Sequence, residues 1–257
     1  MLMARISAAR NSSPDPQVQL TAFENLLGAL YWDGHILGKE YRTILLPTEC
    51  VLYAFIPAHD ALDEPTWNTY ISAFMAKLAG AGLSSPAVSI LGKAEEVSSA
   101  CDCLHSSWLI LYTNLFEIHS PLKCGDCFRP VPLYRLPRLN HGEFYDVLGW
   151  ATSYKSCDSL WLGSSTGEQF GSRELSRIDS SLSRRGLKIC AELEAKTGKP
   201  VYYCLWHYYG RSDKLERARK CPKCGLQWLL TKPVHRFFDF RCDNCRLLST
   251  IAANFRQ

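Results

Sequence analysis

Four cysteines near the C-terminal end of this 257-residue chain constrain its fold more than any other feature. They form two Cys-x-x-Cys pairs, separated by seventeen residues: Cys221, Cys224, Cys242 and Cys245. Two cysteines three positions apart can sit on one tight turn and direct both sulfurs at one ion, and two such turns on a β-hairpin complete a tetrahedral site. The pattern therefore predicts a zinc ribbon in which these four residues bind Zn²⁺.

A site with four thiolate ligands is closed, because it keeps no open coordination position at which a water could be activated. We therefore expect the zinc to stabilise a module of about forty residues that is too small to bury a sufficient core of its own. His235 lies within this module and is expected to be a surface or packing residue, since four thiolates already complete the site.

A third Cys-x-x-Cys pair lies upstream, at Cys124 and Cys127 in "LKCGDCFRP". One interpretation is half of a second zinc site, completed by Cys101 and Cys103 or by His141 or Cys157. A second is a redox pair, although the proline that follows indicates a loop rather than the helix start that thioredoxin-like chemistry requires. A third is a pair of reduced packing cysteines. The sequence leaves the three interpretations open.

The composition is that of a globular protein, with 47% apolar and 21% charged residues. The N-terminal residues lack the apolar stretch of a signal peptide, and the longest apolar runs are too short to span a bilayer. Twelve cysteines without an export signal favour metal binding in a reducing compartment over disulfides. We therefore expect a cytoplasmic protein that has no membrane segment.

Periodicity and chain breakers indicate an α+β protein with four parts. These are a flexible tail over 1–16, an N-terminal mixed α/β domain over 17–118, a Pro-rich joint with helices and an aromatic strand over 119–213, and the four-cysteine zinc ribbon over 214–257.

Within these parts, several elements are predicted by their patterns. The N-terminal domain has the expected order helix, strand, strand, helix, strand, strand. Residues 172–200 carry the strongest helical periodicity in the chain, and Gly198 and Pro200 end the predicted helix. The segment "VYYCLWHYY", 201–209, is apolar on both faces, which is typical of a central strand that is covered on both sides.

The C-terminal part is basic. Residues 214–257 hold ten Lys or Arg and three Asp or Glu, whereas the rest of the chain carries a net charge of −3. This asymmetry suggests an anionic partner, and nucleic acid is the first candidate. Basic side chains could contact phosphates, and an aromatic ring could stack on an unpaired base. The candidate residues are Lys220, Lys223, Trp228, Lys232, Arg236, Arg241 and Arg246.

The same segments resemble a known family. The stretches "FGSRELSRIDSSLSRRGLKICAELEAKTGKPVYYCLWHYYGRS", "CPKCGLQW", "FDFRCDNCRLLS" and "CGDCFRPVPLYRLP" are similar to an uncharacterised bacterial family, described as zinc-ribbon-containing with a suggested role in nucleic-acid binding. The resemblance covers residues 120–257 and implies that Cys221, Cys224, Cys242 and Cys245 are zinc ligands.

Two other classes of function are weighed against nucleic-acid binding. The ribbon could instead bind an acidic protein partner, for example as a toxin-neutralising or adaptor protein, and its aromatic residues could simply be its core. An enzyme is the third class. The histidines have no metal-binding helical spacing, and neither a Gly-x-Ser-x-Gly motif nor a P-loop occurs. We therefore expect a protein that is not an enzyme.

Overall fold

The computed structural model of the chain has two compact units. It describes residues 1–11, 15–38, 42–94, 99–103, 106–139, 143–163 and 166–255. The first unit comprises Met1–Cys101, Ile118–Ser120 and Arg129–Tyr145. The second comprises Asp102–Glu117, Pro121–Phe128 and Asp146–Gln257.

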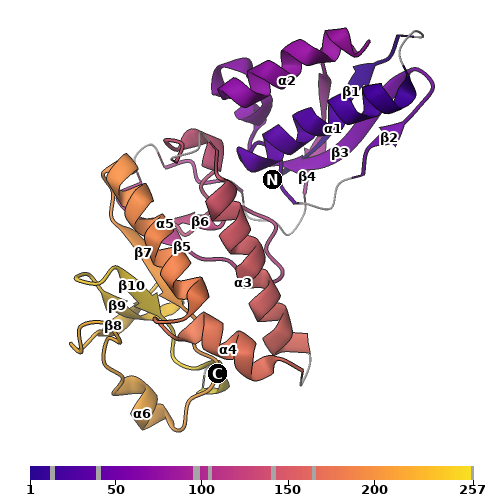
Figure 1. Cartoon of the computed structure of the whole chain (residues 1–257). Coiled ribbons are helices and arrows are strands. Elements are labelled where there is room, and N and C mark those ends of the chain that lie inside the picture. The colour runs from indigo at the N-terminus through magenta and orange to yellow at the C-terminus, as the bar shows by residue number, and fades with distance from the viewer. Residues whose placement is uncertain are drawn as a thin grey trace. The chain divides into compact units, whose positions relative to one another are not determined.

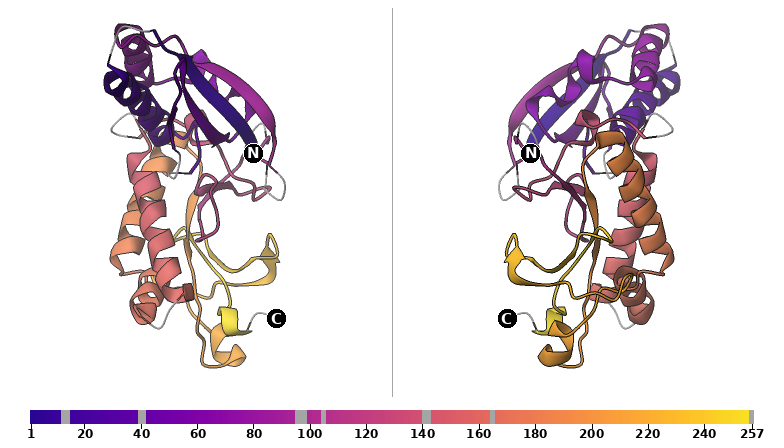
Figure 2. Two further views of the ribbon diagram at one scale, coloured as in Figure 1. Left: turned by 90° about the vertical axis from the view of Figure 1, so that its right-hand side faces the viewer. Right: turned by 90° about the vertical axis from the view of Figure 1, so that its left-hand side faces the viewer.

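The first unit is an antiparallel sheet with two helices on one face (Figure 1; Figure 2). Its main elements are β1 (Leu2–Ala9), α1 (Pro16–Trp32), β2 (Ile44–Leu45), β3 (Glu49–Ile56), α2 (Thr69–Gly80) and β4 (Ala87–Lys93), with the short 3₁₀ helices η1 (His59–Leu62) and η2 (Glu64–Thr66) before α2. The strand order is β2-β3-β1-β4. This β-α-β-β-α-β order with antiparallel neighbours is the ferredoxin-like arrangement.

Strand β1 corrects the expected flexible tail over 1–16. It pairs with β3 on one side and β4 on the other, so it is an inner strand of the sheet. Its alternate residues Ala4, Ile6 and Ala8 are buried. Two of these three are alanines, which bury little apolar area, so the period-2 signal in the sequence is weak.

Helix starts in this unit follow local capping chemistry. Asp15 accepts a hydrogen bond from the backbone N–H of Gln17 at 2.9 Å, and Pro16 occupies the first turn of α1. Asn68 accepts from the N–H of Ile71 at 2.8 Å and so begins α2.

The Pro-rich segment that follows the Cys124–Cys127 pair folds onto the first unit through a polar cluster. This segment includes the 3₁₀ helix η3 (Leu133–Arg135). Arg138 forms an ion pair with Asp33 at 2.7 Å, and Asp33 in turn lies 2.9 Å from Nε2 of His35. The rings of His35 and Tyr134 stack at 4.8 Å. Asp33 and His35 are fully buried, so the charge of Asp33 is compensated by partners rather than by water.

The second unit is built on a six-stranded sheet with the order β6-β5-β7-β10-β9-β8. The strands are β5 (Leu109–Leu111), β6 (Leu122–Cys124), β7 (Val201–Leu205), β8 (Leu229–Val234), β9 (Phe238–Cys242) and β10 (Leu247–Ser249). The helices are α3 (Tyr145–Gly163), α4 (Glu168–Ser176), α5 (Ser181–Thr197) and α6 (Asp213–Arg217), and η4 (Ala253–Phe255) closes the described chain.

Strand β7 lies inside this sheet, as predicted, and all five of its residues are buried, but it ends at Leu205, so residues 206–209 of the predicted strand lie outside it. One of its faces meets the helices, because a Cβ at Gly186 of α5 would lie 2.2 Å from the ring of Tyr203 (Figure 1). The other face joins a cluster that includes Ile110, Tyr202, Phe238 and Leu248. The two apolar faces seen in the sequence are therefore the two sides of this core.

The helix predicted over 172–200 is divided into α4 and α5. The predicted helix is interrupted before Ser180. The side chain of Ser180 accepts a hydrogen bond from the N–H of Ser183 at 3.1 Å and so caps the start of a new helix, α5. The apolar period continues across the break, since Leu175 and Leu182 are both buried. The period of the apolar residues alone therefore did not reveal the break between α4 and α5.

The sheet crosses the predicted boundary between 213 and 214. Strand β10 pairs in parallel with β7, with Leu248 opposite Cys204, and antiparallel with β9. The four-cysteine segment thus extends the sheet of the preceding residues and is not a separate layer. A parallel pairing between distant segments has no local sequence signal, which explains why the sequence predicted a domain boundary at this position.

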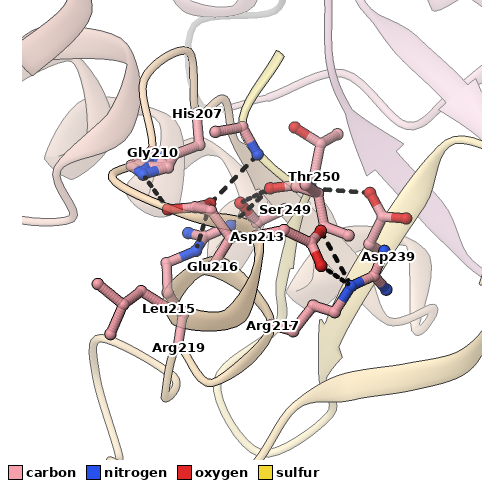
Figure 3. Close-up of polar contacts among 12 residues, drawn as sticks. His207, Gly210, Asp213, Leu215, Glu216, Arg217, Arg219, Asp239, Ser249 and Thr250 are labelled. Atoms are coloured by element: carbon pink, nitrogen blue, oxygen red, sulfur yellow. Dashed lines mark hydrogen bonds and ion pairs between the residues drawn. The ribbon is translucent and has the colours of Figure 1, made fainter. Parts of the chain in front are cut away.

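Polar contacts connect α6 to the segments next to it in the chain and to the residues that follow β10 (Figure 3). Glu216, which is 4% exposed, lies 3.1 Å from Nε of Arg219 and 3.4 Å from Nε2 of His207. It also accepts from the N–H of Ala252 at 3.2 Å, and Arg219 donates to the carbonyl of Thr250 at 2.5 Å. Burial, together with the charge of Arg219, lowers the pKa of His207 to about 4, so its neutral form faces Glu216.

We expect Glu216→Ala to lower the free energy of unfolding by about 2 kcal/mol, because it leaves the partly buried Arg219 without its carboxylate. Asp213→Ala on the same helix is the matched control. It removes only an exposed ion pair with Arg217 and should cost about 0.5 kcal/mol or less. Urea unfolding of both variants measures the difference, and equal costs would contradict a role for the buried pair.

Candidate metal centres

The four cysteines predicted as ribbon ligands lie together. The sulfurs of Cys221, Cys224, Cys242 and Cys245 are all within 4.8 Å of one another. The Sγ atoms of Cys224 and Cys242 are 3.6 Å apart. Four sulfurs placed about 2.3 Å from a central tetrahedral ion would be about 3.8 Å from each other. The described geometry is thus close to that of a tetrathiolate site, and this group can hold a metal ion.

Both halves of the ribbon group have the same backbone conformation after the second cysteine. Gly225, which follows Cys224, has φ 72°, and Arg246, which follows Cys245, has φ 53°. In the first half the N–H of Gly225 donates to the carbonyl of Cys221 at 2.9 Å. This left-handed residue reverses the chain so that both sulfurs of a pair point to one side, and glycine adopts it without steric cost.

The pKa values of the thiols in the ribbon group shift in opposite directions. The backbone N–H of Leu226 points at the sulfur of Cys224, which is exposed, and lowers its pKa to about 7. Burial raises the pKa of Cys242 and of Cys245. A bound cation would supply the charge that keeps these thiols deprotonated. With four sulfurs present, the group is suited to holding a metal structurally rather than to activating a water.

The third cysteine pair belongs to a second group. The sulfurs of Cys101, Cys103, Cys124 and Cys127 also lie within 4.8 Å of one another, with Cys124 at the end of β6. Phe128, which follows Cys127, has φ 61°, and its N–H donates to the carbonyl of Cys124 at 2.9 Å. This loop therefore repeats the conformation of the two ribbon loops, which supports a metal-binding role for the pair.

The structure distinguishes among the candidate metal-site partners that the sequence offered for Cys124 and Cys127. Cys101 and Cys103 are in the group, and Cys157, on α3, is not in either group found among the described residues. His141 lies outside the described residues. The sequence did not predict the left-handed backbone conformation of Phe128, because phenylalanine rarely adopts this conformation.

The predicted nucleic-acid contacts fall into two sets. Lys220, Lys223, Lys232 and Arg236 are exposed, and no ion pair within the described part of the chain involves them.

The remaining three candidates have structural partners. Arg241 pairs with Asp243 at 2.6 Å and Arg246 with Glu194 at 3.2 Å. Trp228 is 3% exposed, and its indole N–H donates to the carbonyl of Arg219 at 3.0 Å. Arg246 therefore connects the ribbon to α5, whereas the cited contacts of Arg241 and Trp228 lie within the ribbon. Because it is buried, the ring of Trp228 is not available for a base to stack on.

His235 is a packing residue, as expected, and is not a member of either cysteine group. Its Nε2 lies 2.6 Å from the carbonyl oxygen of Gly125, and its ring stacks on Phe128 at 5.1 Å. In the described ranges, no helix has the length and apolar character that crossing a membrane requires.

Three family models match consecutive parts of the chain, and each is described as a domain of unknown function. They are DUF8589 over residues 2–92, DUF2310 over 103–206 and DUF8594 over 210–255. These limits differ from the sequence-based domain limits at 118 and 213.

Two Haemophilus influenzae proteins described as uncharacterised are similar to the chain. One is 29% identical over 252 residues, which is 92% of this chain and 97% of that protein. The other is 36% identical over 149 residues, which is 58% of this chain and 73% of that protein.

Proposed function

The chain belongs to the same family as the 36% identical Haemophilus influenzae protein, and from that premise we propose that it is a zinc protein whose ribbon binds nucleic acid. Both four-cysteine groups hold Zn²⁺, and neither is catalytic. The observation that carries the proposal is the repeated loop: three Cys-x-x-Cys turns, each followed by a residue with positive φ, supply six of the eight sulfurs in the two groups, and Cys101 and Cys103 supply the other two. Thiolate sets of this kind select zinc over hard cations such as Mg²⁺ and Ca²⁺.

Elemental analysis of the purified full chain is expected to find about two equivalents of zinc per chain. Cys224→Ser and Cys103→Ser, which alter the exposed member of each group, should each lower the content by about one. Cys190→Ser, a buried cysteine on α5 outside both groups, should leave it unchanged. A well-folded wild-type chain without zinc would contradict the proposal.

The proposed contact to nucleic acid is electrostatic. Lys220, Lys223, Lys232 and Arg236 are exposed cations of the ribbon for which the described structure gives no acidic partner, so their side chains are open to phosphate groups of a nucleic acid. Two of them, Lys220 and Lys223, flank the first ribbon ligand, Cys221. Eight of the twelve cysteines lie in groups that could hold a metal rather than in disulfides, which supports the proposal that the protein acts in the cytoplasm.

We expect the fourfold change of Lys220, Lys223, Lys232 and Arg236 to Ala to reduce the log–log salt slope of oligonucleotide binding by about 3 units. The effect should not depend on base sequence, since phosphates carry no sequence information. The matched control is a fourfold Ala variant of exposed cations outside the ribbon: Lys77, Lys93, Arg184 and Lys196. It should leave the slope unchanged. Fluorescence anisotropy over a salt series, with zinc content measured for each variant, provides the test.

The second candidate function is a protein-binding ribbon. The observation that favours it is apolar exposure beside the first ribbon loop, where Leu226 is 54% exposed and Leu229 is 38% exposed. A partner that covers these leucines and pairs acidic groups with the nearby lysines would fit this surface. If the wild-type chain binds neither DNA nor RNA at low salt, this candidate replaces nucleic-acid binding.

A further inference from the structure

A histidine of the ribbon hairpin contacts the loop of the other cysteine group. Because a carbonyl oxygen can only accept, Nε2 of His235 donates to Gly125, which lies between Cys124 and Cys127. The His235 ring stacks on Phe128, the residue after Cys127, with an interplanar angle of 11°. One side chain from the turn between β8 and β9 therefore contacts the Cys124–Cys127 loop at two points.

Trp108 provides a second connection between the two groups. A Cβ at Gly125 would lie 2.1 Å from its ring, and the N–H of Gly125 donates to its carbonyl at 2.8 Å. On the ribbon side, the guanidinium of Arg241 lies over the Trp108 ring at 4.7 Å. Arg241 directly precedes Cys242, a ribbon ligand. Trp108 thus packs between the backbone of one cysteine loop and a neighbour of a ligand in the other.

The connection through His235 and the connection through Trp108 are not independent, because the rings of Trp108 and His235 also stack on each other at 6.3 Å. The residues of both paths lie in the second unit. We propose that the two four-cysteine groups are energetically coupled: metal in the group of Cys124 and Cys127 stabilises the ribbon group through His235 and Trp108. The coupling rests on the proposal that both groups bind zinc.

The physical basis is the rigidity that a tetrathiolate metal gives to its loops. A filled site fixes the positions of Gly125 and Phe128, and these then hold His235 and Trp108 in one arrangement. When the site is empty, ordering those side chains costs conformational entropy that the ribbon must supply. By linkage the effect is reciprocal, and coupling of this kind typically changes an equilibrium roughly 5- to 150-fold.

Hydrogen exchange of the zinc-loaded full chain tests the coupling without any chelator. Cys103→Ser empties only the second group, as a zinc content of about one equivalent would verify. We expect amides of β9 (Phe238–Cys242) to exchange roughly 5- to 150-fold faster in this variant than in the wild type. In a background that carries His235→Asn and Trp108→Leu, Cys103→Ser should no longer accelerate this exchange. Asn tolerates the left-handed backbone at position 235, where φ is 54°, so that change removes the ring without added strain.

A measurement in the opposite direction, from the ribbon group to the second group, controls for the possibility that one variant misfolds. Cys224→Ser empties the ribbon group and should accelerate exchange at Gly125–Phe128, again only when His235 and Trp108 are present. Cys157→Ser and the exposed His59→Asn are controls and should change neither region. Unchanged exchange in β9 of Cys103→Ser, or equal acceleration without His235 and Trp108, would overturn the coupling while leaving zinc binding intact. A wild type with only one zinc would overturn both proposals.

Discussion

Removal of metal from the full chain is expected to abolish hydrogen-exchange protection in β9 and β10 and to weaken it in β7, rather than to release an isolated tail. Cys242 ends β9, and β10 lies between β9 and β7 in one sheet. Phe238, Phe240 and Leu248 are fully buried. Structural zinc in small modules contributes apparent binding free energies of about 10–16 kcal/mol, which exceeds the total stability of many domains. Loss of that contribution should therefore reach the centre of the sheet.

Exchange followed by mass spectrometry before and after incubation with a chelator measures this effect. Helix α1 is the internal control, because the first unit has its own core and its amides should stay protected. Readdition of zinc should restore the strands. Persistent protection of β9 and β10 in a chain verified to be metal-free would show that the sheet is stable without the ribbon metal.

The parts of the fold that could be predicted are those with local causes. Both cysteine pairs of the ribbon lie on single turns, so the spacing of Cys221 to Cys224 and of Cys242 to Cys245 already implied converging sulfurs. The doubly apolar β7 was recognisable because both faces of the strand are buried. The proximity of Cys101 and Cys103 to Cys124 and Cys127 was one of several open alternatives, and the structure selects it.

The parts of the fold and of the candidate site that could not be predicted depend on contacts between residues that are distant in the sequence. The ion pair of Arg246, unlike that of Arg241 with Asp243, is made with a residue that is distant in the sequence. Arg246 meets Glu194 of α5, and Arg241 meets Trp108, which precedes β5. No local pattern connects these residues, so all the ribbon's cations looked equivalent in the sequence. The parallel pairing of β10 with β7 is equally nonlocal, and it turned an expected separate module into part of the larger sheet.

Among the ribbon residues that are not cysteine ligands, Trp228 is expected to have a large effect on stability when it is substituted. Its ring packs against Phe240 at 5.1 Å, it is 3% exposed, and its indole donates to Arg219, the residue that also pairs with Glu216. Replacing a buried tryptophan with alanine leaves a cavity and an unpaired carbonyl. We expect Trp228→Ala to lower the free energy of unfolding by about 3–5 kcal/mol and to weaken zinc retention.

The matched control for this substitution is Leu226→Ala, two residues earlier, which removes an apolar side chain that is 54% exposed and should change stability by about 0.5 kcal/mol or less. Urea unfolding in the presence of zinc, with metal content measured in parallel, distinguishes a core role from the base-stacking role that the sequence suggested. A stacking residue would keep its stability and zinc when changed to Ala and lose about 1–3 kcal/mol of single-strand affinity. The burial of Trp228 predicts the opposite result, in which any loss of oligonucleotide binding follows from the loss of the folded, zinc-bound ribbon.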